Sequence, residues 1–256
     1  MVGEQVASRE LLLRITQRDL MLRYKQTVMG VGWAIVMPLV NTAIFSVIFT
    51  RVAPIDTGMP YPLYAYSGLL AWNLFASSLR FASTSLTSNS TLVTKISFPR
   101  EILPISSVLV TLVDSIVGAA VLAAMMAYYH VGIAPAILLL PLLIAIELAF
   151  TCAVALLLSM ANLFYRDVKY LLEFLITVWM FGTSVVYPVE LIDGRLGAAL
   201  RLNPMVPIIN GFRTVLIRGE VPDLVPLAAS GVVAIVALVV AWAMFHQAEF
   251  RFAENI

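Results

Sequence analysis

The sequence predicts an all-α membrane protein with six transmembrane helices, an N-terminal amphipathic interface helix, and short re-entrant helices between the fifth and sixth spans. Three observations carry this prediction. Hydrophobic residues make up 61% of the 256 positions and charged residues only 12%, whereas soluble domains average about 45–50% and about 25%. The mean hydropathy is +0.95. The apolar residues gather in six blocks of roughly bilayer-spanning length, since a span takes about 20 helical residues.

The six blocks are expected to cross the hydrocarbon core. They cover residues 31–50, 61–79, 102–129, 135–160, 170–189 and 226–245. The third and fourth blocks exceed the usual length, which predicts tilt or extension past the headgroups. We find no internal repeat and no separate soluble segment, so residues 1–256 are expected to form one membrane domain.

Lys and Arg residues predict the orientation. With the N-terminus inside, the short cytoplasmic segments carry most of these cations, as the positive-inside rule requires. Both termini are therefore expected in the cytoplasm. Residues 8–29 precede the first span, and Arg14, Arg18 and Lys25 fall on one stripe of a helical wheel. This pattern favours a helix lying in the cytoplasmic interface, although a solvated charged helix would fit the same residues.

The segment 190–225 fits neither a span nor a simple loop. Its middle, residues 205–217, is too apolar for a solvated loop, and Pro204, Pro207 and Gly211 break it. Non-helical backbone is tolerated at membrane depth only where it contacts protein or a water-filled cavity. We expect a pair of short helices that re-enter the outer leaflet; an amphipathic flap on the outer surface is the alternative.

A charged segment at residues 94–101, which we call the elbow, lies between two long hydrophobic blocks. Lys95, Arg100 and Glu101 are costly in hydrocarbon, and Pro99 stops a helix from running straight through. The elbow is therefore expected at the cytoplasmic surface, where a soluble partner can bind it.

The sequence contains no recognisable catalytic chemistry. A phosphate-binding Gly-rich loop is absent, so ATP hydrolysis would need a separate subunit, and we expect no enzyme activity and no cofactor in this chain. One cysteine, Cys152, and two histidines, His130 and His246, predict no metal site. A net charge of +1 excludes a polyanion-binding tail, so nucleic acid is not an expected partner.

Two features inside the spans leave alternatives open. Asp114 and Glu147 are ionisable residues within apolar blocks, and they would serve as relay groups in a proton-driven carrier or bond within the bundle. A set of aromatic residues deep in the spans could line a channel for sugars, whose C–H faces pack on rings, or form an interfacial belt. The candidates are Tyr66, Trp72, Phe75, Trp179 and Phe181.

Four stretches occur in an order that resembles the ABC-2 type polysaccharide export permeases, the membrane subunits that export O-antigen, capsule or teichoic acid chains. They are RDLMLRYKQTVMGVGW at residues 18–33, KISFPREILP at 95–104, FYRDVKY at 164–170 with YP at 187–188, and LNPM at 202–205 with GFR at 211–213. The resemblance covers nearly the whole chain.

The resemblance implies partners and roles. The chain would pair with a second copy and dock two ATP-binding cassette subunits, which bind ATP and Mg²⁺, in the bacterial cytoplasmic (inner) membrane. The residues implied to couple to the ATPase are Lys95, Ile96, Ser97, Phe98, Pro99 and Arg100, with Arg23, Tyr24 and Lys25 positioning the interface helix. Those implied to close the outer side are Asn203, Pro204, Pro207, Gly211 and Arg213.

The implied substrate is a cell-surface polysaccharide, linked to undecaprenyl diphosphate, in contact with membrane lipids. Two other functions fit parts of the sequence. An ABC-2 exporter of a small amphiphile or drug would share the topology and the elbow, and a proton-driven secondary carrier would depend on Asp114 and Glu147.

Overall fold

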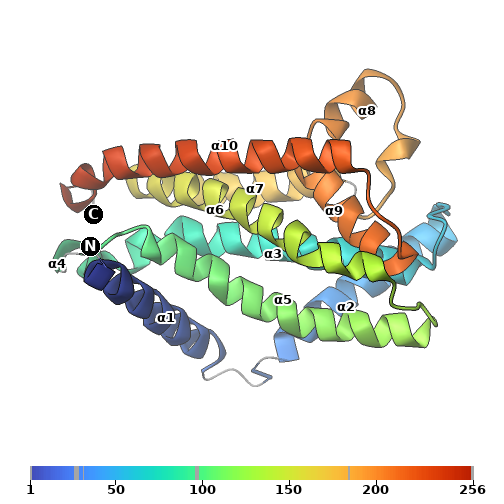
Figure 1. Cartoon of the computed structure of the whole chain (residues 1–256), viewed down its shortest axis with the longest axis horizontal. Helices are drawn as coiled ribbons and strands as arrows, with labels where there is room; N and C mark the ends of the chain where they lie inside the picture. The colour runs from blue at the N-terminus through green and yellow to red at the C-terminus, as the bar shows by residue number, and fades with distance from the viewer. Residues whose placement is uncertain (1, 26–28, 31, 96–97, 184, 255–256) are drawn as a thin grey trace.

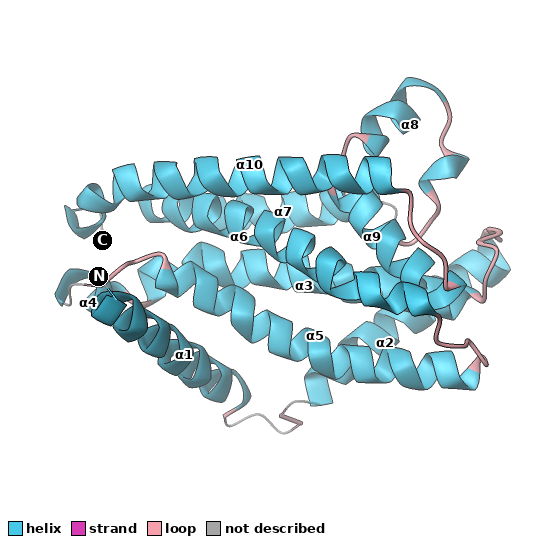
Figure 2. Cartoon of the chain, viewed as in Figure 1, coloured by secondary structure: helices cyan, strands magenta, loops and turns pink. Residues whose placement is uncertain are grey.

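The computed structural model describes residues 2–25, 29–30, 32–95, 98–183 and 185–254, with side chains from residue 9 to residue 252 within those ranges. Every regular element in this part of the chain is a helix, as Figure 2 shows. The prediction of an all-α protein is confirmed.

The elements follow one another along the chain with short connections. They are α1 (Val2–Tyr24), α2 (Gly32–Val47), η1 (Ile48–Val52), α3 (Tyr61–Ser88), α4 (Ser90–Lys95), α5 (Ile102–Tyr128), η2 (Pro135–Leu139), α6 (Leu140–Phe164), α7 (Val168–Phe181), η3 (Val189–Leu191), α8 (Gly194–Arg201), α9 (Met205–Arg213), η4 (Thr214–Arg218), α10 (Leu224–Ala248) and η5 (Glu249–Glu254).

Helix α3 forms the centre of the bundle. It packs against α2, α5, α6, α7 and α9, and most of its 28 residues are buried. Its polar side chains are satisfied within the protein: the hydroxyls of Ser67 and Ser85 donate to the carbonyls of Tyr64 and Ala82. A helix enclosed by protein can carry such residues because its own backbone accepts their hydrogen bonds.

Four helical stretches of the described residues are long and apolar enough to cross a membrane: Gly32–Val52, Ile102–Tyr128, Pro135–Phe164 and Leu224–Phe252. The predicted second span belongs to α3, which is more polar than these four stretches. Helix α3 can carry its polar residues because other helices surround it. The predicted fifth span, 170–189, is shorter than expected. Helix α7 has 14 residues and ends at Phe181, so it extends about 21 Å, less than the roughly 30 Å core.

Different elements lie at the two ends of the molecule. In Figure 1, the marked chain termini and α4 lie together at one end, and α8 and the loop after η1 lie at the other.

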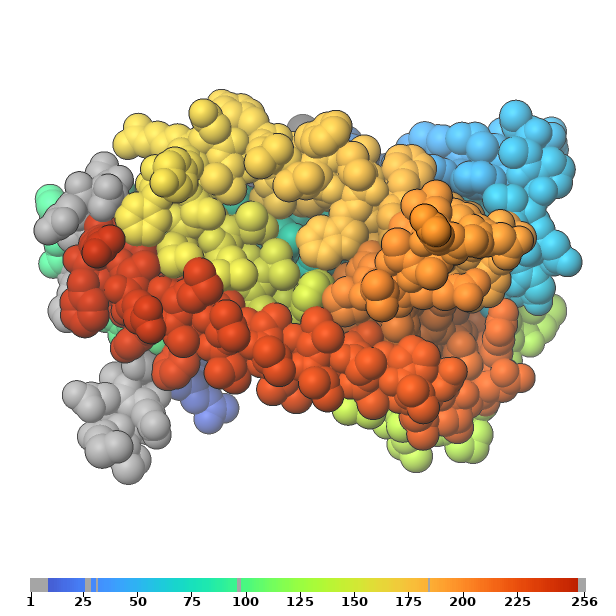
Figure 3. All heavy atoms as spheres, turned by 90° about the horizontal axis from the view of Figure 1, so that it is seen from above, coloured from blue at the N-terminus to red at the C-terminus, as the bar shows by residue number. Residues whose placement is uncertain are grey.

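Helix α1 is inclined to the long helices and packs on α5. It begins before residue 8 and ends at Tyr24, while positions 26–28 of the predicted interface helix lie outside the described residues. Figure 3 shows α10 along one side of the molecule, α7 along the other, and α8 over the far end.

Candidate functional site

The elbow is anchored to the end of the last long helix by Arg100. Its guanidinium donates from Nη1 to the main-chain carbonyl of Glu249 at 2.6 Å and from Nη2 to that of Val93 at 3.4 Å. Its main-chain N–H donates to Glu249 Oε1 at 3.2 Å. One residue thus joins α4, the elbow and η5, so a force on the elbow reaches α10 through hydrogen bonds.

Phe98, one of the residues that the resemblance implies couple to the ATPase, turns its ring toward the core. The ring is partly buried against a core cluster that includes Val93, Ile102 and Phe245, because burial removes its apolar surface from water. Lys95 and Pro99 are exposed and give the elbow its accessible surface. Ile96 and Ser97 lie outside the described residues.

Arg23 and Tyr24 connect the interface helix to a span rather than facing outward. Both donate hydrogen bonds to the carboxylate of Asp114 on α5, and the Arg23 guanidinium lies 3.9 Å from the centre of the Phe81 ring. Burial and the hydrogen bond with Asp114 raise the pKa of Tyr24 to about 12, so its hydroxyl stays a donor near neutral pH. Lys25 is exposed.

The Asp114 cluster opens into a cavity of about 400 Å³ between α1, α2, α3 and α5. Its lining is rich in polar side chains. They include Arg23, Tyr24, Asn41, Asn73, Ser77, Arg80, Thr111 and Asp114. Arg80 also pairs with Glu173 on α7, with Nε 2.9 Å from Oε2. The cavity therefore presents two guanidinium groups, of which Arg80 keeps 38% of its side chain exposed.

At the opposite end, Arg213 ties α9 to the helix bundle. Its side chain is 3% exposed, and it donates to the carbonyls of Val185 at 2.6 Å and Tyr64 at 3.3 Å. The guanidinium stacks 3.7 Å from the centre of the Tyr64 ring. A buried arginine that donates to carbonyl groups and stacks on an aromatic ring makes strong contacts, and these hold α9 against α3 and the segment after α7.

The other predicted outer residues lie in α9 or directly before it. Asn203 donates from Nδ2 to Gly182 O at 3.1 Å and Thr183 Oγ1 at 2.7 Å, and its Oδ1 accepts the N–H of Met205 at the start of α9. Pro204 precedes the first residue of α9, and Pro207 and Gly211 lie within it.

Three of the five predicted channel aromatics, Trp72, Phe75 and Trp179, are brought together, mostly inside the chain. Tyr66 belongs to a separate core cluster near α5. Phe75 lies 5.5 Å from Trp72 and 5.0 Å from Trp179, between ring centres. Trp72, Phe75 and Tyr66 are at most 2% exposed, because α3 is surrounded by other helices. Phe181 is 48% exposed and is the one of the five that presents a large surface.

The two acids in the spans have opposite surroundings. Asp114 is paired with Arg23 and Tyr24, whereas neither carboxylate oxygen of Glu147 meets a donor among the described residues. Glu147 is 1% exposed and lines a groove of about 370 Å³ between α3, α5 and α6 whose other walls are largely apolar. An enclosed carboxyl without a partner is costly to retain.

Three important residues escaped the sequence analysis. Phe150 stacks on Phe75, with ring centres 5.6 Å apart, but it looks like any other apolar residue of its span. Glu249 and Phe252 hold the elbow and the adjoining core cluster, from beyond the last apolar block. The acidic and aromatic residues that follow the last apolar block were the only feature of the sequence that could have indicated these two contacts.

Comparisons with known proteins agree along the length of the chain. A family model described as ABC-2 type transporter matches residues 10–217. The chain is similar to the O-antigen export system permease protein RfbA of Myxococcus xanthus, with 29% identity covering 100% of this chain and 99% of that protein. It is also similar to two proteins of the same description from Klebsiella pneumoniae, with 28% and 27% identity, each covering 96% of this chain and 94% of the relative.

Proposed function

Because the chain belongs to the ABC-2 type transporter family, we propose that it is the transmembrane subunit of an ATP-driven exporter that moves a cell-surface polysaccharide across the cytoplasmic membrane. The observation that carries the proposal is full-length similarity to proteins described as O-antigen export permeases. In this proposal, two copies pair and each docks one ATP-binding cassette subunit, which binds ATP and Mg²⁺ and performs the hydrolysis.

The proposed topology has six crossings with both termini in the cytoplasm. Four crossings are the long apolar stretches, and α3 and α7 supply the other two within the shelter of the bundle. The shared location of the chain ends and α4 supports one cytoplasmic end. The helices α8 and α9 would then re-enter the membrane from the outside, with Asn203, Pro204, Pro207, Gly211 and Arg213 closing the outer side.

The elbow would pass the motion of the ATPase into the spans. Lys95 and Pro99 are exposed at its surface, while Arg100 and Phe98 fix its base to η5 and the core. A partner that pulls on the exposed residues therefore moves the start of α5 and the end of α10 together. Lys25, exposed at the end of α1, would add a second contact to the same partner.

The glycan would pass between two copies of the chain. Helix α7 supports this role because a row of its apolar side chains is exposed. These are Tyr170, Leu171, Phe174, Leu175, Val178 and Phe181. Phe181 and Trp179 would meet the sugar, while Trp72 and Phe75 support Trp179 from behind. Tyr66 bonds instead to the Gly118 carbonyl on α5. The cavity beside Asp114, with Arg23 and Arg80, fits the diphosphate of an undecaprenyl-linked chain through charge-assisted hydrogen bonds.

Crosslinking tests the proposal directly. In a Cys152→Ala background, Lys95→Cys places a thiol on the elbow, and Glu220→Cys places a matched exposed thiol beyond η4. We expect co-purification with two ATPase subunits and a crosslink from position 95 but not from position 220. A chain that purifies alone, or that crosslinks equally from both positions, would contradict the proposal.

A second candidate is export of a small amphiphile. The apolar groove of about 370 Å³ beside Glu147 favours it, since the groove matches a small hydrophobic molecule better than a polymer. A proton-driven carrier is a third candidate and rests on the unpaired Glu147. Transport assays separate the three. Polymer export that needs the ATPase and persists in Glu147→Gln supports the main proposal, and proton-linked transport that is lost in the same variant supports the carrier.

A further inference from the structure

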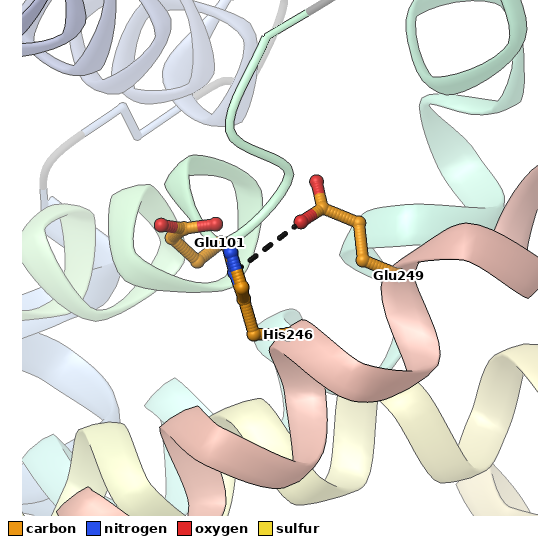
Figure 4. Close-up of side chains that lie close together, drawn as sticks. All are labelled: Glu101, His246 and Glu249. Carbon is orange, nitrogen blue, oxygen red and sulfur yellow. Dashed lines mark ion pairs between the residues drawn. The ribbon is translucent and has the colours of Figure 1, made fainter.

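Three side chains converge where the elbow meets the end of α10. Glu101 comes from the residue before α5, His246 from the last turn of α10, and Glu249 from the start of η5. The possible ligand atoms of the three residues all lie within 4.8 Å of one another. Figure 4 shows the His246 ring close to both carboxylates. We propose that this cluster is a binding site for a divalent transition-metal ion, with Zn²⁺ as the best match.

The spacing is close to that of a zinc site. Zinc binds imidazole nitrogen at 2.0–2.1 Å and carboxylate oxygen at 2.0–2.2 Å in tetrahedral geometry, which separates neighbouring ligand atoms by about 3.3 Å. His246 Nδ1 lies 3.5 Å from Glu249 Oε2. The remaining separations, up to 4.8 Å, close with side-chain movements of about 1 Å or slightly more. The His246 side chain is 58% exposed, so packed protein does not block such a movement.

The surroundings leave ligand positions open. Glu101 Oε2 is shielded from solvent and has no hydrogen-bond donor among the described residues. This is an unfavourable state for a carboxylate oxygen, and a cation relieves it. Arg100 does not occupy the carboxylates with its guanidinium, which donates to the main-chain carbonyls of Glu249 and Val93.

Neighbouring groups also orient the ligands. The main-chain N–H of Arg100 donates to Glu249 Oε1 at 3.2 Å, which leaves Oε2 directed at His246. The Trp242 ring stacks on the imidazole with the ring centres 5.6 Å apart. Partners that hold the ligands in place are a usual part of metal sites.

The donor set determines the class of metal. One imidazole and two carboxylates suit Zn²⁺ and its first-row neighbours, whereas Mg²⁺ and Ca²⁺ prefer oxygen ligands alone. The three protein ligands leave a fourth position for water. The sequence predicted no metal site on the ground that the chain has one cysteine and two histidines. Glu101 and His246 are far apart along the chain, and only the fold brings them together. A bound ion would tie the elbow to the end of the last span.

Calorimetric titration with ZnCl₂ tests the site on the purified chain in detergent micelles, prepared without a polyhistidine tag. We expect one Zn²⁺ per chain, with affinity at least tenfold weaker in His246→Ala and in Glu101→Gln. His130→Asn and Glu220→Gln are the matched controls and should bind like the unmodified protein. Asparagine is chosen because residue 130 has a φ of 56°, which asparagine tolerates.

Cobalt gives a second readout. Co²⁺ in place of Zn²⁺ should give the visible absorption bands of a tetrahedral nitrogen–oxygen site, and these should be lost in His246→Ala while the helical circular dichroism is unchanged. Absence of Zn²⁺ binding, or equal binding by His246→Ala and His130→Asn, would overturn the proposal. The measurement uses this chain alone, so its result does not depend on whether the chain exports a polysaccharide.

Discussion

Gly68 lies where α3, α9 and the segment after α7 approach most closely. A Cβ atom added at this position would lie 2.2 Å from Arg213 Nη2 and 2.6 Å from the main-chain oxygen of Val185. Both distances are well inside van der Waals contact, since real Cβ atoms essentially never lie within 3.0 Å of such an atom. The Val185 oxygen belongs to the backbone and cannot rotate away, so Gly68→Ala must displace the hydrogen bond between the Arg213 guanidinium and that oxygen.

The size of the effect follows from one favourable and two unfavourable contributions to the free energy of unfolding. In the middle of a helix, alanine is more favourable than glycine by about 1 kcal/mol. Displacing a charge-assisted hydrogen bond in an enclosed site costs about 1.5–3 kcal/mol, and moving packed backbone costs about 1–3 kcal/mol more. We therefore expect Gly68→Ala to lower the free energy of unfolding by about 1.5–5 kcal/mol.

Gly231 on α10 provides a matched control. It is also a buried glycine within a helix, but the nearest atom to an added Cβ is Ile146 Cδ1 at 3.6 Å, an ordinary contact. Gly231→Ala should therefore raise stability by about 0.5–1 kcal/mol. Unfolding in detergent micelles, followed by the intrinsic fluorescence of the four tryptophans, measures both variants. Equal stability of Gly68→Ala and Gly231→Ala would refute the close approach of Arg213 to α3.

Three further predictions concern the other sites. Arg100→Ala removes the bonds to η5 and α4, so it should cost about 1–3 kcal/mol in thermal unfolding, whereas Arg14→Ala, in an exposed pair, should cost under about 0.5 kcal/mol. The unfolded chain releases the Tyr24 proton before the folded chain does, so this residue's contribution to stability falls as the pH rises from 10 to about 12. The difference in melting temperature between the unmodified protein and Tyr24→Phe should change across that range, and a constant difference would contradict the combined effect of burial and the Asp114 bond on the Tyr24 pKa. Glu147→Leu should be at least as stable as the unmodified protein, because the carboxyl has no partner among the described residues; a marked loss of stability would mean that Glu147 is bonded in the working protein.

The sequence alone predicted the all-helical class and the four long apolar helices. It could do so because the thickness of a bilayer fixes how many consecutive apolar residues a spanning helix needs. It misjudged α7, whose apolar pattern continues past Phe181 although the helix ends there. The burial of Phe98 and of the aromatic residues on α3 also escaped prediction. A hydrophobic pattern does not distinguish a surface that faces lipid, a second copy or the core of the same chain.

The polar contacts were the least predictable part. Arg23 and Asp114 were recognised separately, as a residue of the interface helix and an acid in a span, and only the crossing of α1 over α5 pairs them. Arg213 was expected to help close the outer side, and its enclosure by Tyr64 and Val185 was not predicted. Pairings of this kind join residues more than twenty positions apart, and no spacing rule connects them.

The serine-rich surface of α3 has a consequence for how the protein is made. Between residues 61 and 88, this helix enters the lipid with less apolar surface than the four long stretches. Most of its serine and threonine hydroxyls bond to its own backbone, but the Tyr66 hydroxyl donates to the Gly118 carbonyl and the Ser78 hydroxyl bonds to Thr111, both on α5. During synthesis α3 emerges before α5, so these two hydroxyls gain their partners only after a later helix has been translated. Assembly of the bundle is therefore cooperative from its centre outward, and α5 is as much a requirement for the insertion of α3 as it is a neighbour in the finished structure.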